Sequence, residues 1–159
     1  MEQNQFISTD VKTGIAKGES FCAYQERSQY EVRGKLMKLG LRGEELEEVV
    51  SHLIVNNYLN EERFAKAYAQ GKLRIKSWGK NKISQGLKFK QVSAPLIKKA
   101  LQSLDGDEYL EKLKQILIKK EKDIKEKVAY KKKYKLVQYA LSRGFEQDLI
   151  FFVLKDNDL

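Results

Sequence analysis

Apolar side chains recur at helical spacing along most of the chain, and this pattern predicts an all-α protein. From Tyr24 onward they fall three or four residues apart, as Val32 and Leu36 do, and as Leu46 and Val49 do further on. That spacing places them on one face of an α-helix. With 10 glycines and one proline in 159 residues, turn signals are too sparse for the repeated hairpins of an all-β fold.

Helix-end signals divide this pattern into successive helices. Gly40 is a suitable C-terminal cap for the helix that begins after Tyr24, and Gly43 opens the next helix. Asn60 is a suitable N-cap for a third helix over 61–76. The repetition of such signals predicts helices joined by short turns.

An internal repeat relates these helices. A shift of 51 residues superposes apolar positions of one unit on those of the next, namely Val32 on Ile83, Leu36 on Leu87, Leu41 on Val92 and Leu46 on Ile97. A further shift of 53 takes Val92 to Phe145 and Ile97 to Ile150. Ile83 and Leu87 match Val137 and Leu141 at a shift of 54, which suggests one residue gained before that turn. Repeats of this size bury their apolar faces by stacking.

The sequence therefore predicts tandem three-helix repeats that form an elongated, curved array. Gly14 and Gly18 lie in a polar N-terminal stretch, which we expect to be mobile. The expected parts are a flexible segment over 1–20, a first repeat over 21–76, a second over 77–124, and a third over 125–159 that lacks its last helix.

The net charge of +9 is concentrated in the middle of the chain. Residues 1–59 carry 7 Lys and Arg against 9 Asp and Glu, residues 60–100 carry 11 against 2, and residues 101–159 carry 13 against 11. Solubility alone does not require such a concentration, although a basic surface of no specific function remains the alternative. A focused positive field favours a polyanionic partner.

The sequence contains no group of residues that indicates catalysis, a cofactor or a metal site. His52 and Cys22 are the only residues of their kinds and are best explained as packed side chains. Neither a Walker-type loop nor a GxGxxG fingerprint is present. The EELEE run fits a helix start better than a pair of catalytic acids. We therefore expect no enzyme activity, no cofactor and no metal.

Membrane and secretory segments are not expected. No apolar run approaches the roughly 18 residues that a membrane helix needs, and the N-terminal residues do not resemble a secretory signal. A single cysteine fits a reducing compartment. We expect a cytoplasmic monomer.

Basic side chains on the helix expected over 61–76 form a candidate binding surface. Arg63, Lys66 and Arg74 align along one polar stripe, and lysines continue the charge past the turn at Trp78-Gly79. Cations at such intervals suit phosphates or an acidic protein groove. The expected contact residues for DNA or a partner are Arg27, Arg33, Arg63, Lys66, Lys72, Arg74, Lys76, Trp78, Lys80 and Lys82.

Two features leave alternatives open. Trp78 stacks on a base or anchors an interface, or else it packs the joint between two repeats, which we favour. A second basic run over 119–135 is either a solvated helix with internal ion pairs or a surface that follows phosphates. Within it Tyr130 and Tyr134 lie one turn apart, and are either buried or beside a ligand.

Several short motifs resemble the RecX family of bacterial recombination regulators. They are YQERS (24–28), YEVRxxL (30–36), YLNEERFA (58–65), KLRI (72–75) and WG (78–79). The resemblance extends from Phe21 to Leu104 and continues more loosely through the third repeat. It implies tandem three-helix repeats, which the periodicity also predicts independently.

The resemblance further implies a role in DNA repair, recombination and the SOS response. Members bind the RecA recombinase, lodge in the groove of its filament on single-stranded DNA, and inhibit its ATPase and strand exchange. We accordingly expect a RecA-filament regulator. The alternatives are a helix-turn-helix-like protein that binds duplex DNA without RecA, and a helical adaptor for another protein. The acidic EELEE helix argues against base reading by the former.

Overall fold

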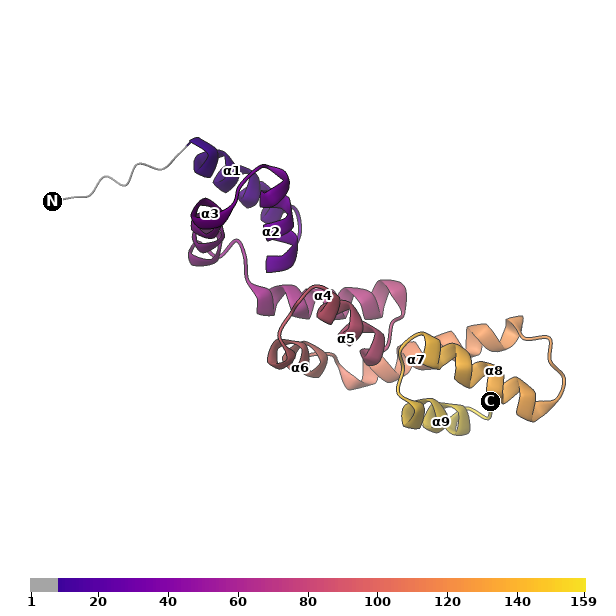
Figure 1. Cartoon of the computed structure of the whole chain (residues 1–159). Coiled ribbons are helices and arrows are strands. Elements are labelled where there is room, and N and C mark those ends of the chain that lie inside the picture. The colour runs from indigo at the N-terminus through magenta and orange to yellow at the C-terminus, as the bar shows by residue number, and fades with distance from the viewer. Residues whose placement is uncertain (1–8) are drawn as a thin grey trace. The chain divides into compact units, whose positions relative to one another are not determined.

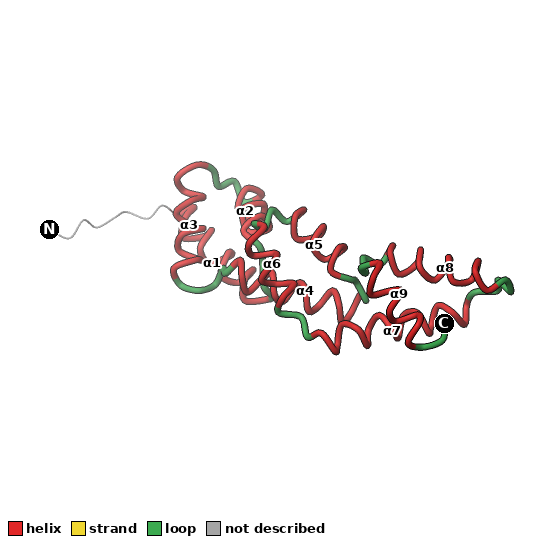
Figure 2. The backbone as a smooth tube through the Cα atoms, turned by 90° about the horizontal axis from the view of Figure 1, so that it is seen from below, coloured by secondary structure: helices red, strands yellow, loops and turns green. Residues whose placement is uncertain are grey.

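The computed structural model describes residues 9–159, which fold into nine α-helices and, over that range, no strand (Figure 2). The helices are α1 (Thr9–Tyr24), α2 (Gln29–Lys38), α3 (Gly43–Val55), α4 (Glu61–Lys76), α5 (Lys80–Phe89), α6 (Ala94–Gln102), α7 (Gly106–Asp123), α8 (Ala129–Ser142) and α9 (Gln147–Asp156). A long helix followed by two shorter ones occurs three times in this order (Figure 1). The predicted all-α fold of tandem three-helix repeats is confirmed.

The N-terminal part differs from the flexible segment that we predicted over 1–20. Residues from Thr9 onward form α1, whose Val11 is buried, while residues 1–8 lie outside the described residues. Gly14 and Gly18, which suggested mobility, lie where α1 meets Leu41, Val49 and Leu53. The absence of a side chain at both positions allows this close packing, so the glycines serve helix contact rather than flexibility.

The repeat is also phased differently from our expectation. Because α1 precedes α2 and α3, each long helix begins a three-helix group, and α7, α8 and α9 form a complete last one. The shift between the second and third groups is 53 throughout: Ile83 and Leu87 correspond to Leu136 and Ala140, all fully buried. No residue is gained before the turn. The predicted shift of 54 was therefore wrong. It paired Ile83 and Leu87 with Val137 and Leu141, each of which follows the corresponding core residue by one position.

The described chain divides into two compact units. One runs to Phe64 and includes residues 90–92, and the other holds residues 65–89 and 93–159. In the first unit, α1, α2 and α3 enclose a core that contains Val32, Leu36, Val49 and Leu53. In the second unit, the long helix α7 packs against both α8 and α9 (Figure 1). The buried residues of this unit include Leu113 and Leu117 of α7, and Phe145, which lies between α8 and α9.

Two large apolar residues on α3 and α4 are exposed. Ile54 and Ile75 have 45% and 80% of their surfaces accessible. In α4 the buried face includes Ala65, Ala69 and Leu73. Small alanines fill a tightly packed face just as large residues do, so hydrophobic size alone does not locate the buried face of a helix.

Two glycines form a backbone junction inside the second unit. The N–H of Gly79 donates to the carbonyl of Arg143 at 2.8 Å, and the N–H of Asn81 donates to the carbonyl of Gly144 at 2.9 Å. A Cβ at Gly79 would overlap the backbone of Gly144 and Phe145, and one at Gly144 would overlap the backbone of Lys82. The turn before α5 therefore lies directly against the turn before α9.

The buried side chain of Tyr109 in α7 contacts the same junction. Its ring packs against Phe145 at 5.2 Å between centroids, and its hydroxyl accepts the N–H of Lys80 at 2.9 Å and donates to the Glu146 carboxylate. Burial, together with the hydrogen bond to Glu146, raises the pKa of Tyr109. The hydroxyl thus keeps its proton and its role as a donor to Glu146.

We predict that Gly79→Ala lowers the free energy of unfolding by about 3 kcal/mol, because the added methyl meets backbone atoms that cannot rotate away. The matched control is Gly34→Ala in α2, where an added Cβ meets nothing within 4 Å. That control should gain up to about 1 kcal/mol from better helix propensity. Thermal and urea unfolding followed by circular dichroism measure both changes, and equal stability of the two variants would contradict the junction.

Candidate nucleic-acid interface

Arg27 and Arg63, which we predicted as contact residues, both make contacts within the first unit. Arg27 donates to the Phe21 carbonyl at 2.9 Å and stacks 3.8 Å above that residue's ring. Arg63 donates through Nε to Glu26 at 2.5 Å, and its terminal nitrogens reach Asn57 and the Tyr58 carbonyl. These contacts occupy the Nε donor of Arg27 and the Nε, Nη1 and Nη2 donors of Arg63 within the first unit.

Two further predicted arginines form paired hydrogen bonds with carboxylates. Arg33 contacts both oxygens of Glu47 at 2.5 and 3.2 Å, and Arg74 contacts both oxygens of Glu108 at 2.6 and 3.1 Å. The hydrogen bonds from the guanidinium groups lower the pKa values of Glu47 and Glu108. Both pairs are partly solvent-exposed, so they contribute little stability, but their charge is already compensated locally.

The residues around the α4–α5 turn form a compact group in the second unit. We define the Trp78 cluster as Tyr68, Lys72, Trp78 and Lys82. The ammonium of Lys72 lies 4.8 Å from the Trp78 ring centroid and 5.3 Å from that of Tyr68, and the ammonium of Lys82 lies 4.9 Å from Trp78. Two cations therefore flank one indole ring.

Local structure explains why the Trp78 cluster assembles. The chain leaves α4 through Ser77, whose φ of 54° is in the left-handed region, and the Trp78 N–H then donates to the Lys72 carbonyl at 3.1 Å. Gly86 of α5 leaves room for the Tyr68 hydroxyl, which a Cβ there would overlap. The junction at Gly79 begins immediately after Trp78, whose side chain is half-buried. Packing of the ring in the joint between repeats, which we favoured, stays a prediction.

The other predicted lysines lie around this group. Lys66 is half-buried, and Lys76 is exposed while its carbonyl accepts from the Arg143 guanidinium. Lys80 places its ammonium 5.0 Å from the Tyr109 ring centroid. The structure therefore brings Lys72, Trp78 and Lys82 together, and shows that the predicted arginines are engaged elsewhere.

The second basic run, over 119–135, is the other feature that we left open. The run is not the single helix that we expected, because α7 ends at Asp123 and α8 begins at Ala129. Lys132 of α8 pairs with Glu121 of α7 at 2.7 Å, and Lys135 approaches Glu126 of the intervening loop at 3.9 Å, so these ion pairs lie between elements rather than within one helix. Tyr130 and Tyr134, however, are 72% and 64% exposed and so are not buried. Their spacing of four residues on α8 was the only signal in the sequence that they share a face.

Other expected absences can be examined only within residues 9–159. In that range no cluster of His, Cys, Asp or Glu is arranged to hold a metal ion, and no helix has the length and apolar character needed to cross a membrane. Cys22 is buried, which raises its pKa. His52 Nε2 lies 2.7 Å from Glu19 Oε1, so it connects α3 with α1.

Sequence reasoning missed the contacts that form the junction. Gly144, Tyr109 and Glu146 lie far from Trp78 in the chain, and no local pattern links them. The one available signal was the repeat itself, which places Gly144 at the position of Gly40, since both glycines have φ above 90° before a buried apolar residue.

Three consecutive three-helix groups with a basic middle section define this chain as a helical-repeat protein. The family models described as the second and third three-helix domains of RecX match residues 60–101 and 107–154. The chain belongs to the RecX family. The matched domains agree with a phase in which the long helix comes first, since they contain α4 to α6 and α7 to α9.

Relatives support this membership. The regulatory protein RecX of Haemophilus influenzae strain PittGG is 32% identical over 130 residues, which cover 81% of this chain and 84% of that protein. The RecX proteins of Lactobacillus johnsonii and Bacillus licheniformis are 33% and 30% identical, with 88% and 94% of this chain covered. This chain spans only 52% and 57% of their lengths, about half.

Solved structures show the same fold. A crystal structure of RecX from Lactobacillus salivarius matches with a TM-score of 0.85 at 23% identity, and the match covers 94% of this chain and 97% of that one. A second crystal structure of regulatory protein RecX matches with a TM-score of 0.83 at 18% identity, covering 93% and 72% of the two chains.

We predict that Arg63→Ala lowers the free energy of unfolding by about 2 kcal/mol, because Glu26 then loses its charged partner. One oxygen of Glu26 is already buried without a hydrogen-bond partner within the described structure. The control Lys76→Ala removes an exposed cation and should change stability by less than about 0.5 kcal/mol. Urea unfolding distinguishes them, and an unaffected Arg63→Ala protein would return Arg63 to the list of candidate contact residues.

Proposed function

We propose that this chain is a non-enzymatic regulator that binds RecA filaments on single-stranded DNA and lowers their recombinase and ATPase activity. Its membership in the RecX family is the observation that carries the proposal. Such a protein acts in the cytoplasm on DNA repair and recombination. No catalytic group is required of it, because a bound protein changes filament activity through the states that it stabilises.

The Trp78 cluster is the surface that we propose for nucleic acid. Lysines attract phosphates, and the exposed part of the half-buried indole ring offers a stacking surface to a base. Lys72 and Lys82 already contact the Trp78 ring, so a phosphate that approaches them brings its base close to the same ring. The arginines of the original prediction are less suited, since a phosphate would have to displace Glu26, Glu47 or Glu108.

We predict that Lys72→Glu/Lys82→Glu weakens binding to single-stranded DNA at least tenfold and reduces the salt slope of the affinity by about 2. Lys12→Glu/Lys155→Glu makes the same change of net charge at exposed positions of α1 and α9 and serves as the control. Fluorescence anisotropy of a labelled oligonucleotide over a range of salt concentrations measures both. Equal losses in the two variants would mean that net charge, not this cluster, binds DNA.

We predict that titrating the protein into RecA filaments preformed on single-stranded DNA lowers their ATPase rate at levels well below that of RecA. One regulator per many protomers suffices if it caps or disassembles a filament, whereas competition for bare DNA requires comparable amounts. The measurement is steady-state ATP hydrolysis. An unchanged rate at a wide excess of protein would overturn the proposal, and salt-sensitive binding to bare DNA would then favour independent DNA binding.

A further inference from the structure

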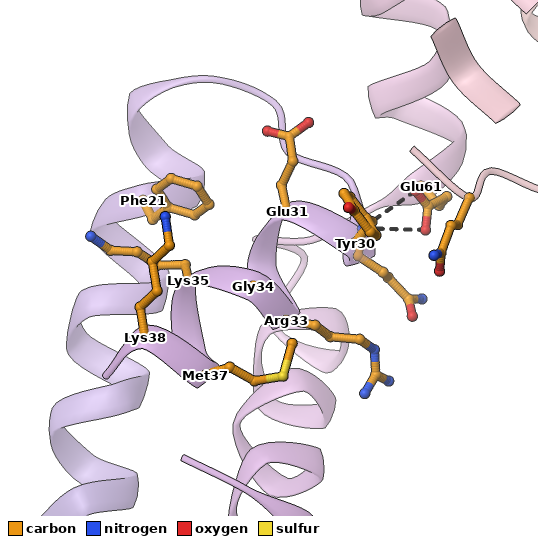
Figure 3. A pocket seen from close by; sticks show the side chains of 11 residues that line it. Phe21, Tyr30, Glu31, Arg33, Gly34, Lys35, Met37, Lys38 and Glu61 are labelled. Atoms are coloured by element: carbon orange, nitrogen blue, oxygen red, sulfur yellow. Dashed lines mark hydrogen bonds between the residues drawn. The ribbon is translucent and has the colours of Figure 1, made fainter. Parts of the chain in front are cut away.

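The outer side of α2 in the first unit carries an open groove of about 800 Å³. Its lining includes Phe21 of α1, Glu61 of α4, and Tyr30, Gly34, Met37 and Lys38 of α2 (Figure 3). Tyr30 and Met37 are 41% and 42% exposed, so both leave apolar surface open to the groove. The groove lies outside the Trp78 cluster and plays no part in the nucleic-acid surface described above.

Gly34 forms part of this groove and is not explained by packing. Glycine inside a helix costs about 1 kcal/mol relative to alanine, so it is normally kept where a side chain would collide. Gly14, Gly18 and Gly86 follow that rule, since an added Cβ would press on Leu41, Leu53 and Tyr68 respectively. At Gly34, and likewise at Gly71 of α4, an added Cβ meets nothing within 4 Å, but of these two open positions only Gly34 lines the groove. The space left above Gly34 is therefore available to a group from another molecule.

The charges around the groove define which kind of group fits. Lys35 and Lys38 lie beside Phe21 at one end, and Tyr30 lies beside Glu61 at the other (Figure 3). Both lysines are exposed, whereas Glu31 above the groove is already approached by Arg27 at 3.9 Å and Lys90 at 3.6 Å. A carboxylate next to an apolar side chain complements this arrangement.

Nucleic acid is disfavoured as the occupant. Glu61 faces the groove, where both of its oxygens accept the Gln29 N–H at 3.3 Å, and burial raises its pKa. Arg33, which also lines the groove, is committed to Glu47. Residues 1–59 carry more acidic than basic side chains, in contrast to the basic middle section. A polyanion would find little attraction on this side of α2.

We propose that this groove docks a protein segment that lays a large apolar side chain over Gly34, between Tyr30 and Met37, and directs a carboxylate to Lys35 and Lys38. The segment belongs to the recombinase filament, so the inference rests on the proposed function. In this arrangement the first unit contacts protein, and the Trp78 cluster of the second unit contacts nucleic acid.

The test compares Gly34→Leu, whose side chain occupies the groove, with Gly34→Ala, which leaves it open. Affinity is measured for RecA filaments preformed on single-stranded DNA and, separately, for the bare DNA. Gly34→Leu should bind filaments at least tenfold more weakly than Gly34→Ala while both bind bare DNA like the original protein. Thermal unfolding confirms the fold of each variant, because the position is open and should tolerate both residues.

A second pair tests the charge. Lys35→Glu/Lys38→Glu should weaken filament binding several-fold more than the control Lys12→Glu/Lys155→Glu, which changes the net charge equally. Filament binding unaffected by Gly34→Leu would overturn the groove while leaving the proposed function intact. An equal loss of bare-DNA binding would show that the groove holds nucleic acid and overturn the protein contact. If the unaltered protein fails to bind filaments, the proposed function fails, and with it the proposed occupant.

Discussion

The close approach of two backbone turns at Gly79 and Gly144 is the constraint on which the second unit depends. Side chains at these positions would separate the turns, and the hydrogen bonds to the Arg143 and Gly144 carbonyls would be lost. Because Tyr109 and its partner Glu146 lie at the same place, the long helix α7 is oriented by this contact as well. The Trp78 ring precedes the junction by one residue, so the position of the candidate interface follows from the position of the joint.

Much of the fold could be predicted from the sequence because helical periodicity is a local property. The repeat located the buried positions Val32, Ile83 and Leu87, and the cap residues placed several helix ends. The first helix escaped prediction because Gly14 and Gly18 were interpreted through their conformational freedom. Their actual role depends on Leu41 and Leu53, which are distant in sequence. The curvature of the array stays a prediction.

The candidate site was less predictable for a related reason. A sequence shows how many cations lie along a helix, but not which of them have carboxylates opposite. Arg33 and Arg74 each find a carboxylate on another helix, 14 and 34 residues away. The lysines of the Trp78 cluster contact aromatic faces instead, and a cation held by a ring keeps its charge available to a phosphate. Composition therefore shows where the basic section lies, whereas only the structure shows which of its cations already have carboxylate partners.

The glycines inside helices of this protein fall into two kinds, according to whether an added Cβ would collide with neighbouring atoms. Where an added Cβ would collide, as at Gly86, the residue is required by the protein's own packing. Where the surrounding space is open, as at Gly34 and Gly71, the lower helix propensity has no compensation from packing within the described structure. Of these two, only Gly34 lines the groove, where the proposed partner would supply that compensation.

The two units carry surfaces of different chemical character. One has a basic aromatic surface beside a rigid joint, and the other has an apolar groove with lysines at one end, so the two surfaces are suited to chemically different partners. A regulator that recognises a protein filament wrapped on nucleic acid needs both kinds of contact, since charge alone would not distinguish the filament from bare DNA.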